Sequence, residues 1–257
     1  MRKDIFDRVC SGILPRINRE SISQGVVRSR TDLKRVHSGT TVLAFFYDKG
    51  IILAGDRKTS CGFSIVDQDK VKLYQVAPHS ACAAAGLVSD IQMLVRDLEQ
   101  VNGAFFSQYG YLLSIEGQVN YLINQFRYYW QYTFAPLEVS IFLGGLNPKN
   151  GSFQLFDIGS DGFQRECLDY VVNGSGSDFA ATKLEESRKK ILEKKLSKDE
   201  AIELALRAIF MAGKKDLGTS DVRVAIPTIA TIDNKGFSFM DSEVIGKALS
   251  TIIKEET

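Results

Sequence analysis

Residues 40–56 of this chain read TTVLAFFYDKGIILAGD, two apolar runs on either side of the connection Asp48-Lys49-Gly50. Both runs are rich in residues that favour strands, and a short connection containing glycine between two such runs is typical of a β-hairpin. We therefore predict two strands, over 40–47 and 51–56, that pair with each other.

The strand pattern continues as far as Gly86, where the spacing of apolar residues becomes helical. The predicted strands are 63–66, 71–77 and 80–85. Ser89 and Asp90 are candidate N-terminal caps, and apolar residues then recur every three or four positions, which predicts an amphipathic helix. The stripe of this helix consists of Ile91, Leu94, Val95, Leu98 and Val101. A second helix has the stripe Val119, Leu122, Ile123, Phe126 and Trp130.

The second half of the chain repeats this succession of strands and helices. Strands are predicted over 138–145, 152–159, 163–172, 222–233 and 237–241. Three helices are predicted: one that follows residues 174–177 and runs to about Leu192, one that begins at a capping box formed by Ser197 and Glu200, and one that begins at Ser242. Pro227 inside an apolar run indicates an edge strand or a bulge. Paired strands separated by pairs of helices do not suit a parallel βαβ sheet. We predict an α+β fold of two mainly antiparallel sheets with helices on both outer faces.

Size and composition limit the class of protein. The 257 residues, 44% hydrophobic and 25% charged, suffice for one large domain or two small ones. A net charge of +1 offers no global attraction for nucleic acid or a membrane surface. The sequence contains neither a secretory signal nor an apolar run of membrane-spanning length. Its four scattered cysteines do not resemble a disulfide framework, so we expect a cytoplasmic protein.

The charges are unevenly distributed along the chain. Residues 1–39 contain nine Lys or Arg and four acidic residues, a net charge of +5, which leaves −4 on residues 40–257. This leader also lacks sustained strand or helix patterning, and regular patterning begins at Thr40. We predict a boundary between 39 and 40, although a flexible N-terminal arm would account for the same pattern.

Only two histidines, His37 and His79, are present, so a Ser-His-Asp or Cys-His catalytic arrangement has few candidate bases. No spacing of Cys or His residues indicates a metal site. An alternative base for an alcohol nucleophile is a backbone α-amine, which titrates at about 7.7 to 8.0. The Gly39-Thr40 junction can supply such an amine if the leader is removed, because Thr40 would then be residue one. By itself this junction is also compatible with an ordinary strand that begins with threonine.

Beyond these residues, five segments together resemble the N-terminal nucleophile hydrolases of the proteasome β-subunit family. The segments are GTTVLAFFYDKGIILAGDRKTSCG (39–62), AGLVSD (85–90), GSGS (174–177), KKDLGTSD (214–221) and VRVAIPTIATID (222–233). The resemblance covers essentially all of 40–257 and is closest to the bacterial, actinobacterial-type branch. It implies a four-layer αββα sandwich, with 1–39 as a propeptide and 40–257 as the catalytic domain.

The resemblance also implies site residues, because counting from Thr40 places the family's acid, lysine and glycine on Asp56, Lys72 and Gly86 without a gap. Thr40 would be the nucleophile of a threonine endopeptidase, freed by self-cleavage after Gly39, with Lys72 and Asp56 as a charge pair and Gly86 N–H as the oxyanion donor. The supporting group around the amine would be Ser175, Asp216 and Thr219. Substrate-binding positions would be Thr59, Ser60, Lys70, Tyr74, Ala84, Val88 and Gln92. The two-residue period of a strand places Lys70, Lys72 and Tyr74 on one strand face, and the spacing favours Lys72 as the catalytic lysine.

One block departs from the family pattern, Asp-x-x-Ser-Gly-Gly. Here it reads Asp216-Leu217-Gly218-Thr219-Ser220-Asp221, without the two glycines and with an additional carboxylate at Asp221. Thr219 still supplies a hydroxyl, but the loop beside the amine would differ.

The family implies an assembly of homo-heptameric β-rings between rings of α-subunits, fed with unfolded polypeptide by an ATPase ring. It implies no metal ion or organic cofactor, no nucleic acid and no membrane partner. Two alternatives stay open: a self-assembling β-like hydrolase without α partners, and a catalytically silent structural subunit.

Overall fold

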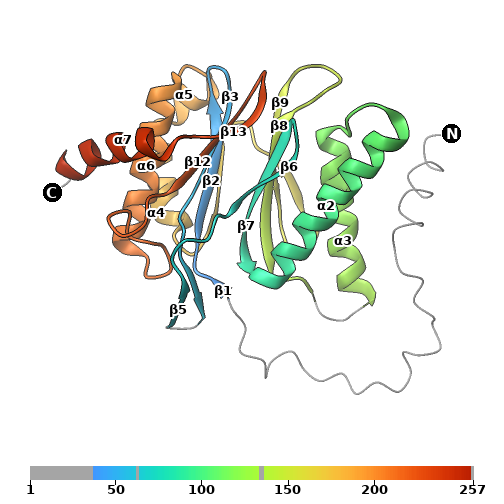
Figure 1. Cartoon of the computed structure of the whole chain (residues 1–257), viewed down its shortest axis with the longest axis horizontal. Helices are drawn as coiled ribbons and strands as arrows, with labels where there is room; N and C mark the ends of the chain where they lie inside the picture. Colours follow the sequence, from blue (N-terminus) through green and yellow to red (C-terminus); the bar gives the residue numbers. More distant parts are fainter. Residues whose placement is uncertain (1–36, 62–63, 133–135, 256–257) are drawn as a thin grey trace. The chain divides into compact units, whose positions relative to one another are not determined.

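The computed structural model describes residues 37–61, 64–132 and 136–255, which belong to one unit, Lys34–Thr257 (Figure 1). Positions 1–36 of the predicted leader lie outside the described residues. In chain order, the elements are β1 (His37–Ser38), β2 (Thr41–Tyr47), β3 (Gly50–Gly55), β4 (Thr59–Cys61), β5 (Ser64–Asp67), β6 (Leu73–Ala77), β7 (Ser80–Leu87), α2 (Val88–Tyr109), α3 (Ile115–Tyr132), β8 (Val139–Leu146), β9 (Phe153–Ile158), β10 (Gln164–Glu166), β11 (Tyr170–Gly174), α4 (Ser177–Glu185), α5 (Arg188–Leu192), α6 (Lys198–Lys215), β12 (Thr228–Asp233), β13 (Gly236–Phe239) and α7 (Ser242–Glu255).

The strands form two large sheets. One has the order β1-β7-β8-β9-β10, with β6 also paired to β7, and the other has the order β11-β2-β3-β12-β13. A separate hairpin consists of β4 and β5. All the strand pairs among the described residues are antiparallel, which confirms the predicted fold class.

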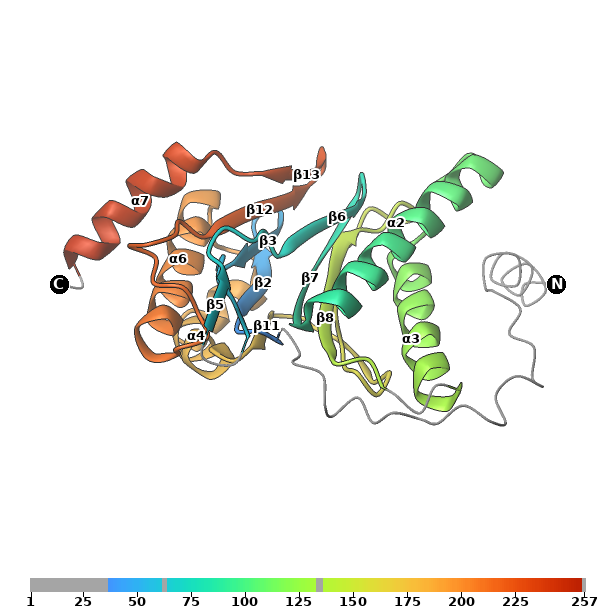
Figure 2. The ribbon, with the colours of Figure 1, turned by 60° about the horizontal axis from the view of Figure 1, so that its bottom comes forward.

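Helices cover the outer face of each sheet (Figures 1 and 2). Helices α2 and α3 pack on β6 to β9, whereas α4, α5 and α6 pack on β2, β3 and β11, and α7 packs on α6. The two sheets face each other through contacts of β2 with β7 and of β11 with both β7 and β8. The described residues thus form the four layers helix, sheet, sheet, helix.

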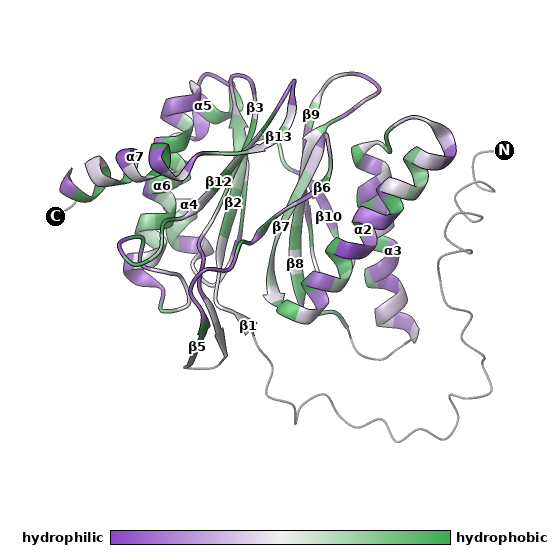
Figure 3. Ribbon diagram, viewed as in Figure 1, coloured by the Kyte–Doolittle hydropathy of each residue, from purple (hydrophilic) through white to green (hydrophobic). Residues whose placement is uncertain are grey.

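Strand β7 shows how the sequence builds two cores from one sheet. Ala81 and Ala83 belong to the hydrophobic cluster that includes the second sheet, while Cys82 and Ala84 belong to the cluster with α2 and α3. This follows from the two-residue period of a strand, whose successive side chains point to opposite faces. Figure 3 shows the complementary pattern on the helices, which carry both hydrophobic and hydrophilic residues.

The hairpin β2–β3 is confirmed, and it lies at the centre of its sheet. All seven residues of β2 and all six of β3 are buried, because one face meets the other sheet and the other face meets the helices. Burial of each large apolar side chain stabilises the fold by roughly 1.5 to 3 kcal/mol. The hairpin therefore gives a rigid base to the residues at its ends.

The predicted strand over 163–172 is wrong. The segment contains two short strands, β10 in one sheet and β11 in the other, with bends at Leu168 and Asp169 between them. A single straight strand cannot pair within both layers, so the chain bends where it crosses from one to the other.

The prediction for 222–233 is also corrected. Residues 222–224 form a turn, the chain bends at Ala225, and β12 begins at Thr228, directly after Pro227. Strand β12 pairs with both β3 and β13, so it is neither an edge strand nor bulged at the proline. Because proline lacks an N–H donor, the central strand begins only after it.

Several element boundaries differ from the sequence prediction. The helix expected to run to Leu192 is divided into α4 and α5, and β6 begins at Leu73 rather than at 71. Helix α2 begins at Val88 with Leu87 as its N-cap residue, so Ser89 and Asp90 lie in the first turn and do not cap it. The capping box of Ser197 and Glu200 on α6 is confirmed.

These two helix starts allow a matched test. Replacing Ser197 with Ala should lower the free energy of unfolding by about 1 kcal/mol, because the Glu200 backbone N–H loses its side-chain acceptor. The control Ser89→Ala should change it by less than about 0.5 kcal/mol, since exposed Ser89 caps nothing. Urea unfolding at one protein concentration measures both, and equal losses would contradict the assigned caps.

Candidate active site

Thr40 lies between β1 and β2 and is fully buried. The two residues before Gly39 pair with β7 in antiparallel register, His37 opposite Leu87 and Ser38 opposite Gly86. The Gly39–Thr40 peptide bond is therefore held at the end of a short extended segment that belongs to the first sheet, while Thr41 begins the second.

Lys72 is the centre of a polar cluster around Thr40. Its Nζ atom lies 2.7 Å from Asp56 Oδ1 and 2.9 Å from Thr40 Oγ1. It also donates to the backbone oxygens of Lys58 at 2.5 Å and Gly39 at 3.0 Å. An ammonium group has three N–H donors, so four acceptors saturate it and fix its position.

Asp56 directly follows β3 and is also buried. Its Oδ1 accepts the Lys72 ammonium and the Thr41 backbone N–H, the latter at 2.9 Å. Its Oδ2 accepts the backbone N–H groups of Lys58 and Ser220, each at 3.0 Å, and the Ser220 hydroxyl at 3.1 Å. Both carboxylate oxygens are thus fully hydrogen-bonded, as a buried charge requires.

The surroundings of Lys72 act on its charge in opposite directions. Burial lowers the pKa of Lys72 below its usual value, because a low-dielectric environment disfavours the ammonium form. The negative charges of Asp56 and Asp216 oppose this effect, and the positive charge of Lys58 adds to it. The net effect is a pKa of Lys72 below its usual value.

A second polar group faces the backbone nitrogen of Thr40. The Thr40 N–H donates to Ser175 Oγ at 3.3 Å, and Ser175 in turn donates to Asp216 Oδ2 at 2.6 Å. Thr219 Oγ1 donates to the same carboxylate oxygen at 2.6 Å and lies 2.6 Å from Thr41 Oγ1. Burial acts to raise the pKa of Asp216, but these hydrogen bonds outweigh it and hold the pKa below its usual value.

Two glycines adopt conformations that the site requires. Gly86 has φ +130°, and a Cβ there would lie 2.0 Å from the backbone oxygen of Glu138. Gly174 has φ +108°, and a Cβ there would lie 2.0 Å from the backbone oxygen of Thr40. Side chains at these positions would therefore displace either the backbone of Glu138, which directly precedes β8, or Thr40 itself.

The structure thus brings together the residues predicted for chemistry. Thr40, Asp56 and Lys72 are joined by direct hydrogen bonds, and Ser175, Asp216 and Thr219 form one network at the Thr40 nitrogen. Gly86 lies in register with Ser38, one residue before Gly39.

The predicted substrate-binding residues are arranged less compactly. Thr59 is buried with its hydroxyl unpartnered, and Lys70 is half-buried. Tyr74 packs against the hydrophobic cluster that contains α2 and α3, and burial raises its pKa to about 12. Ala84 is buried on β7, Val88 is half-buried, and Gln92 is exposed one turn later on α2. The side chain of Ser60 lies outside the described residues.

The face predicted for Lys70, Lys72 and Tyr74 needs correction, because β6 begins only at Leu73. Lys70 and Lys72 lie in the irregular segment before this strand, so the period-two relation does not extend to them. Their burial separates them instead: Lys72 is only 2% exposed, whereas Lys70 is half-buried.

Sequence reasoning assigned no role to Ser220 or Lys58, both of which contact the site. Ser220 binds Asp56, and the Lys58 backbone contributes both an N–H to Asp56 and an oxygen to Lys72. One feature of the sequence does point to Ser220: it stands at a position where the family pattern has glycine.

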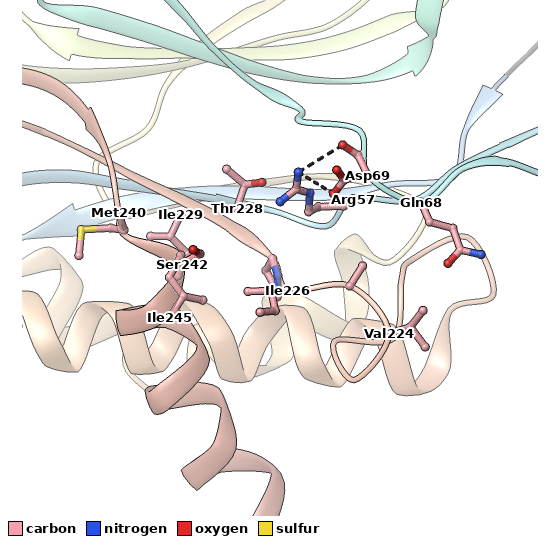
Figure 4. A pocket seen from close by; sticks show the side chains of 12 residues that line it. Arg57, Gln68, Asp69, Val224, Ile226, Thr228, Ile229, Met240, Ser242 and Ile245 are labelled. Carbon is pink, nitrogen blue, oxygen red and sulfur yellow. Dashed lines mark hydrogen bonds and ion pairs between the residues drawn. The ribbon is translucent and has the colours of Figure 1, made fainter.

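A pocket of about 450 Å³ is lined by Arg57, which follows Asp56 in the chain, but includes neither Thr40 nor Lys72 (Figure 4). Arg57, held by Asp69, forms its polar side, and Ile226, Met240 and Ile245 contribute apolar walls. Over 37–61, 64–132 and 136–255, no cluster of three His, Cys, Asp or Glu residues is arranged to hold a metal ion. In the same ranges, no helix combines the length and hydrophobicity needed to cross a membrane.

Comparison with known proteins gives a consistent family. The family model described as "Proteasome subunit" matches residues 36–226. "Proteasome subunit beta" of Jonesia denitrificans is 30% identical over 222 residues, which are 85% of this chain and 72% of that protein. "Proteasome subunit beta" of Methanoculleus marisnigri is 30% identical over 76% of this chain and 87% of its own length. "Proteasome subunit beta 2" of Thermomonospora curvata is 27% identical over 84% of this chain and 76% of its own length. The chain therefore belongs to the proteasome subunit family, and the relatives to which it is similar are β-subunits.

Proposed function

We propose that this chain is a catalytic β-subunit of a 20S proteasome, a threonine endopeptidase that degrades unfolded polypeptides. The observation that carries the proposal is the position of Lys72 Nζ, which lies 2.9 Å from Thr40 Oγ1 and 2.7 Å from Asp56 Oδ1. A cation at this distance favours ionisation of the hydroxyl and so increases its nucleophilicity.

We propose that the first reaction is removal of residues 1–39. The hydroxyl oxygen of Thr40 attacks the Gly39 carbonyl carbon, and the peptide C–N bond breaks as the Thr40 nitrogen takes a proton, which leaves an ester. Water then hydrolyses the ester and frees the Gly39 carboxylate and the Thr40 amine. Lys72 donates to the Gly39 oxygen at 3.0 Å, where negative charge develops during the attack.

In the processed protein, the free α-amine would accept the Thr40 hydroxyl proton when that oxygen attacks a substrate peptide. Ser175, Asp216 and Thr219 would orient the amine through the network that now holds the Thr40 N–H. The Gly86 N–H would stabilise the oxyanion. An acyl-enzyme would form with release of the first product, and water would hydrolyse it.

The pairing of His37–Ser38 with β7 supports a polypeptide substrate. These residues add a strand to the edge of the first sheet, ending immediately before the bond to be cut. A substrate bound in the same way would gain main-chain hydrogen bonds that are independent of its sequence. Such binding suits an enzyme that degrades many different chains.

The altered block at 216–221 is compatible with activity. Thr219 supplies the hydroxyl that the family pattern places there, and it binds Asp216. The added carboxylate of Asp221 is paired with Arg223 at the surface and does not add to the network at the Thr40 nitrogen. A catalytically silent subunit would have no need for the complete set of Thr40, Asp56 and Lys72.

The assembly is part of the proposal. We propose homo-heptameric β-rings, flanking α-subunit rings and an ATPase ring, within the cytoplasm of an organism that has the actinobacterial-type particle. The relatives from Jonesia and Thermomonospora support this branch. A self-assembling hydrolase without α partners is the alternative, and negative-stain images with and without a co-expressed α-subunit distinguish the two.

We propose that the predicted specificity pocket prefers large apolar residues before the cut. Ala84 is small and buried, and Tyr74 and Val88 offer apolar surface. Half-buried Lys70 can keep its ammonium in solvent while its stem adds apolar wall, and its charge would attract an acidic residue and repel a basic one.

The first prediction concerns the nucleophile. Thr40→Ala should retain residues 1–39 and lose peptidase activity by at least about 1000-fold, because no hydroxyl remains to form the ester. Thr40→Ser should retain both reactions in part. Intact-mass and N-terminal analysis, together with labelling by a threonine-reactive covalent probe, measure this; a wild-type protein that begins elsewhere would contradict the assignment.

The second prediction separates the two lysines. Lys72→Ala should prevent leader removal and peptide hydrolysis, because Thr40 Oγ1 and Asp56 lose the ammonium between them, and Asp56→Asn should be impaired likewise. The matched control Lys70→Ala should still be processed and active, since Lys70 lies outside this cluster. Circular dichroism checks that each variant is folded. If Lys70→Ala were inactive and Lys72→Ala active, the assignment of Lys72 as the catalytic lysine would be wrong.

The third prediction concerns substrate preference. Fluorogenic peptides that end in Leu or Tyr should be cleaved fastest, those that end in Glu at an appreciable rate, and those that end in Arg most slowly. Initial rates at equal concentration provide the ranking. Fastest cleavage after Arg would exclude this pocket, whereas fastest cleavage after Glu would mean that the Lys70 ammonium faces inward.

A further inference from the structure

Ser220 has a buried side chain in the loop after α6, only 6% exposed, at a position where the family pattern has glycine. Its hydroxyl lies between two groups of the segment that follows β3. The Oγ atom is 3.1 Å from Asp56 Oδ2 and 3.0 Å from the backbone nitrogen of Arg57. The loop is thereby attached to the end of the central hairpin, 164 residues earlier in the sequence.

The chemistry of these partners fixes the direction of both hydrogen bonds. Arg57 N–H can only donate, so Ser220 Oγ accepts from it and its single proton is directed to the Asp56 carboxylate. The Ser220 backbone N–H donates to the same Oδ2 atom at 3.0 Å. Ser220 thus binds one carboxylate oxygen twice and also satisfies a neighbouring backbone donor.

This arrangement fixes the orientation of the Asp56 carboxylate relative to Lys72. Oδ2 is occupied by Ser220 and the Lys58 N–H, which leaves Oδ1 for Lys72 Nζ at 2.7 Å and the Thr41 N–H. Rotation of the carboxylate would break several hydrogen bonds at once. Because Lys72 Nζ is in turn 2.9 Å from Thr40 Oγ1, the orientation of Asp56 is transmitted to the hydroxyl.

We infer that Ser220 is a positioning residue, whose hydroxyl locks Asp56 in the orientation that holds Lys72 against Thr40. The inference rests on the proposed function and identifies a contribution that a glycine at this position cannot make. With glycine, the backbone N–H could still bind Asp56, but Oδ2 would lose the hydroxyl donor and the Arg57 N–H would lose its acceptor.

The test compares four variants in the full chain, expressed as the wild type is: Ser220→Ala, Ser220→Gly, Ser220→Thr and the exposed control Ser250→Ala on α7. Leader removal is followed by intact mass, and kcat and KM are measured on a peptide ending in Leu. Ser220→Ala and Ser220→Gly should lower kcat about tenfold, as expected for one hydrogen bond to a charged group, with KM within about twofold. Ser220→Thr, which keeps the hydroxyl, should retain at least about half of kcat, and Ser250→Ala should match wild type.

The outcomes separate this inference from the proposed function. Wild-type kcat in both Ser220→Ala and Ser220→Gly, while Thr40→Ala is inactive, would overturn the role of Ser220 and leave the proposed function intact. A rise in KM alone, or a loss in Ser220→Thr as large as in Ser220→Ala, would also overturn it. Equal activity of wild type and Thr40→Ala would overturn the proposed function itself. If Ser220→Ala does not fold, Ser220→Gly carries the same comparison.

Discussion

The buried ion pair between Lys72 and Asp56 is the interaction on which the site depends. Removing two charges from water costs several kcal/mol for each ion, and their attraction offsets this only with good geometry and complete hydrogen bonding. Here Lys72 binds four acceptors and both oxygens of Asp56 are occupied. Thr40 thus lies against an ammonium group that its hydrogen bonds hold in one position.

The sandwich explains how distant segments meet these strict requirements. The ends of β2 and β3 supply Thr41 and Asp56 from a hairpin that is buried on both faces, and the segment before β6 supplies Lys72. Strand β7 of the facing sheet holds the residues before Gly39. Because close-packed layers resist small displacements, distances near 3 Å between these segments can be maintained.

The sequence predicts the parts of this structure that depend on local pattern. The β2–β3 hairpin, the stripe of α2 and the capping box at Ser197 follow from periodicity and turn chemistry, and the spacing from Thr40 to Lys72 follows from the family resemblance. The division of 163–172 between two sheets and the late start of β12 depend on tertiary packing, which local pattern does not encode. Ser220 escaped prediction because the family pattern has glycine at this position, so the resemblance assigns no role to its side chain, and its partner Asp56 is 164 residues away.

In the proposed self-cleavage, the attached leader places a constraint that would not apply to later cleavages. While Gly39 is bonded to Thr40, the Thr40 nitrogen is an amide and donates its N–H to Ser175, so it has no basic lone pair for the hydroxyl proton. Lys72 Nζ lies within hydrogen-bond distance of both Thr40 Oγ1 and the Gly39 oxygen, so it is the ionisable group placed to take part in that proton transfer. We therefore expect the same lysine to have a larger share of the proton transfer in self-cleavage than in peptide hydrolysis, where the freed α-amine is available. Release of the leader would then both uncover the strand site on β7 and create the base that the mature reaction uses.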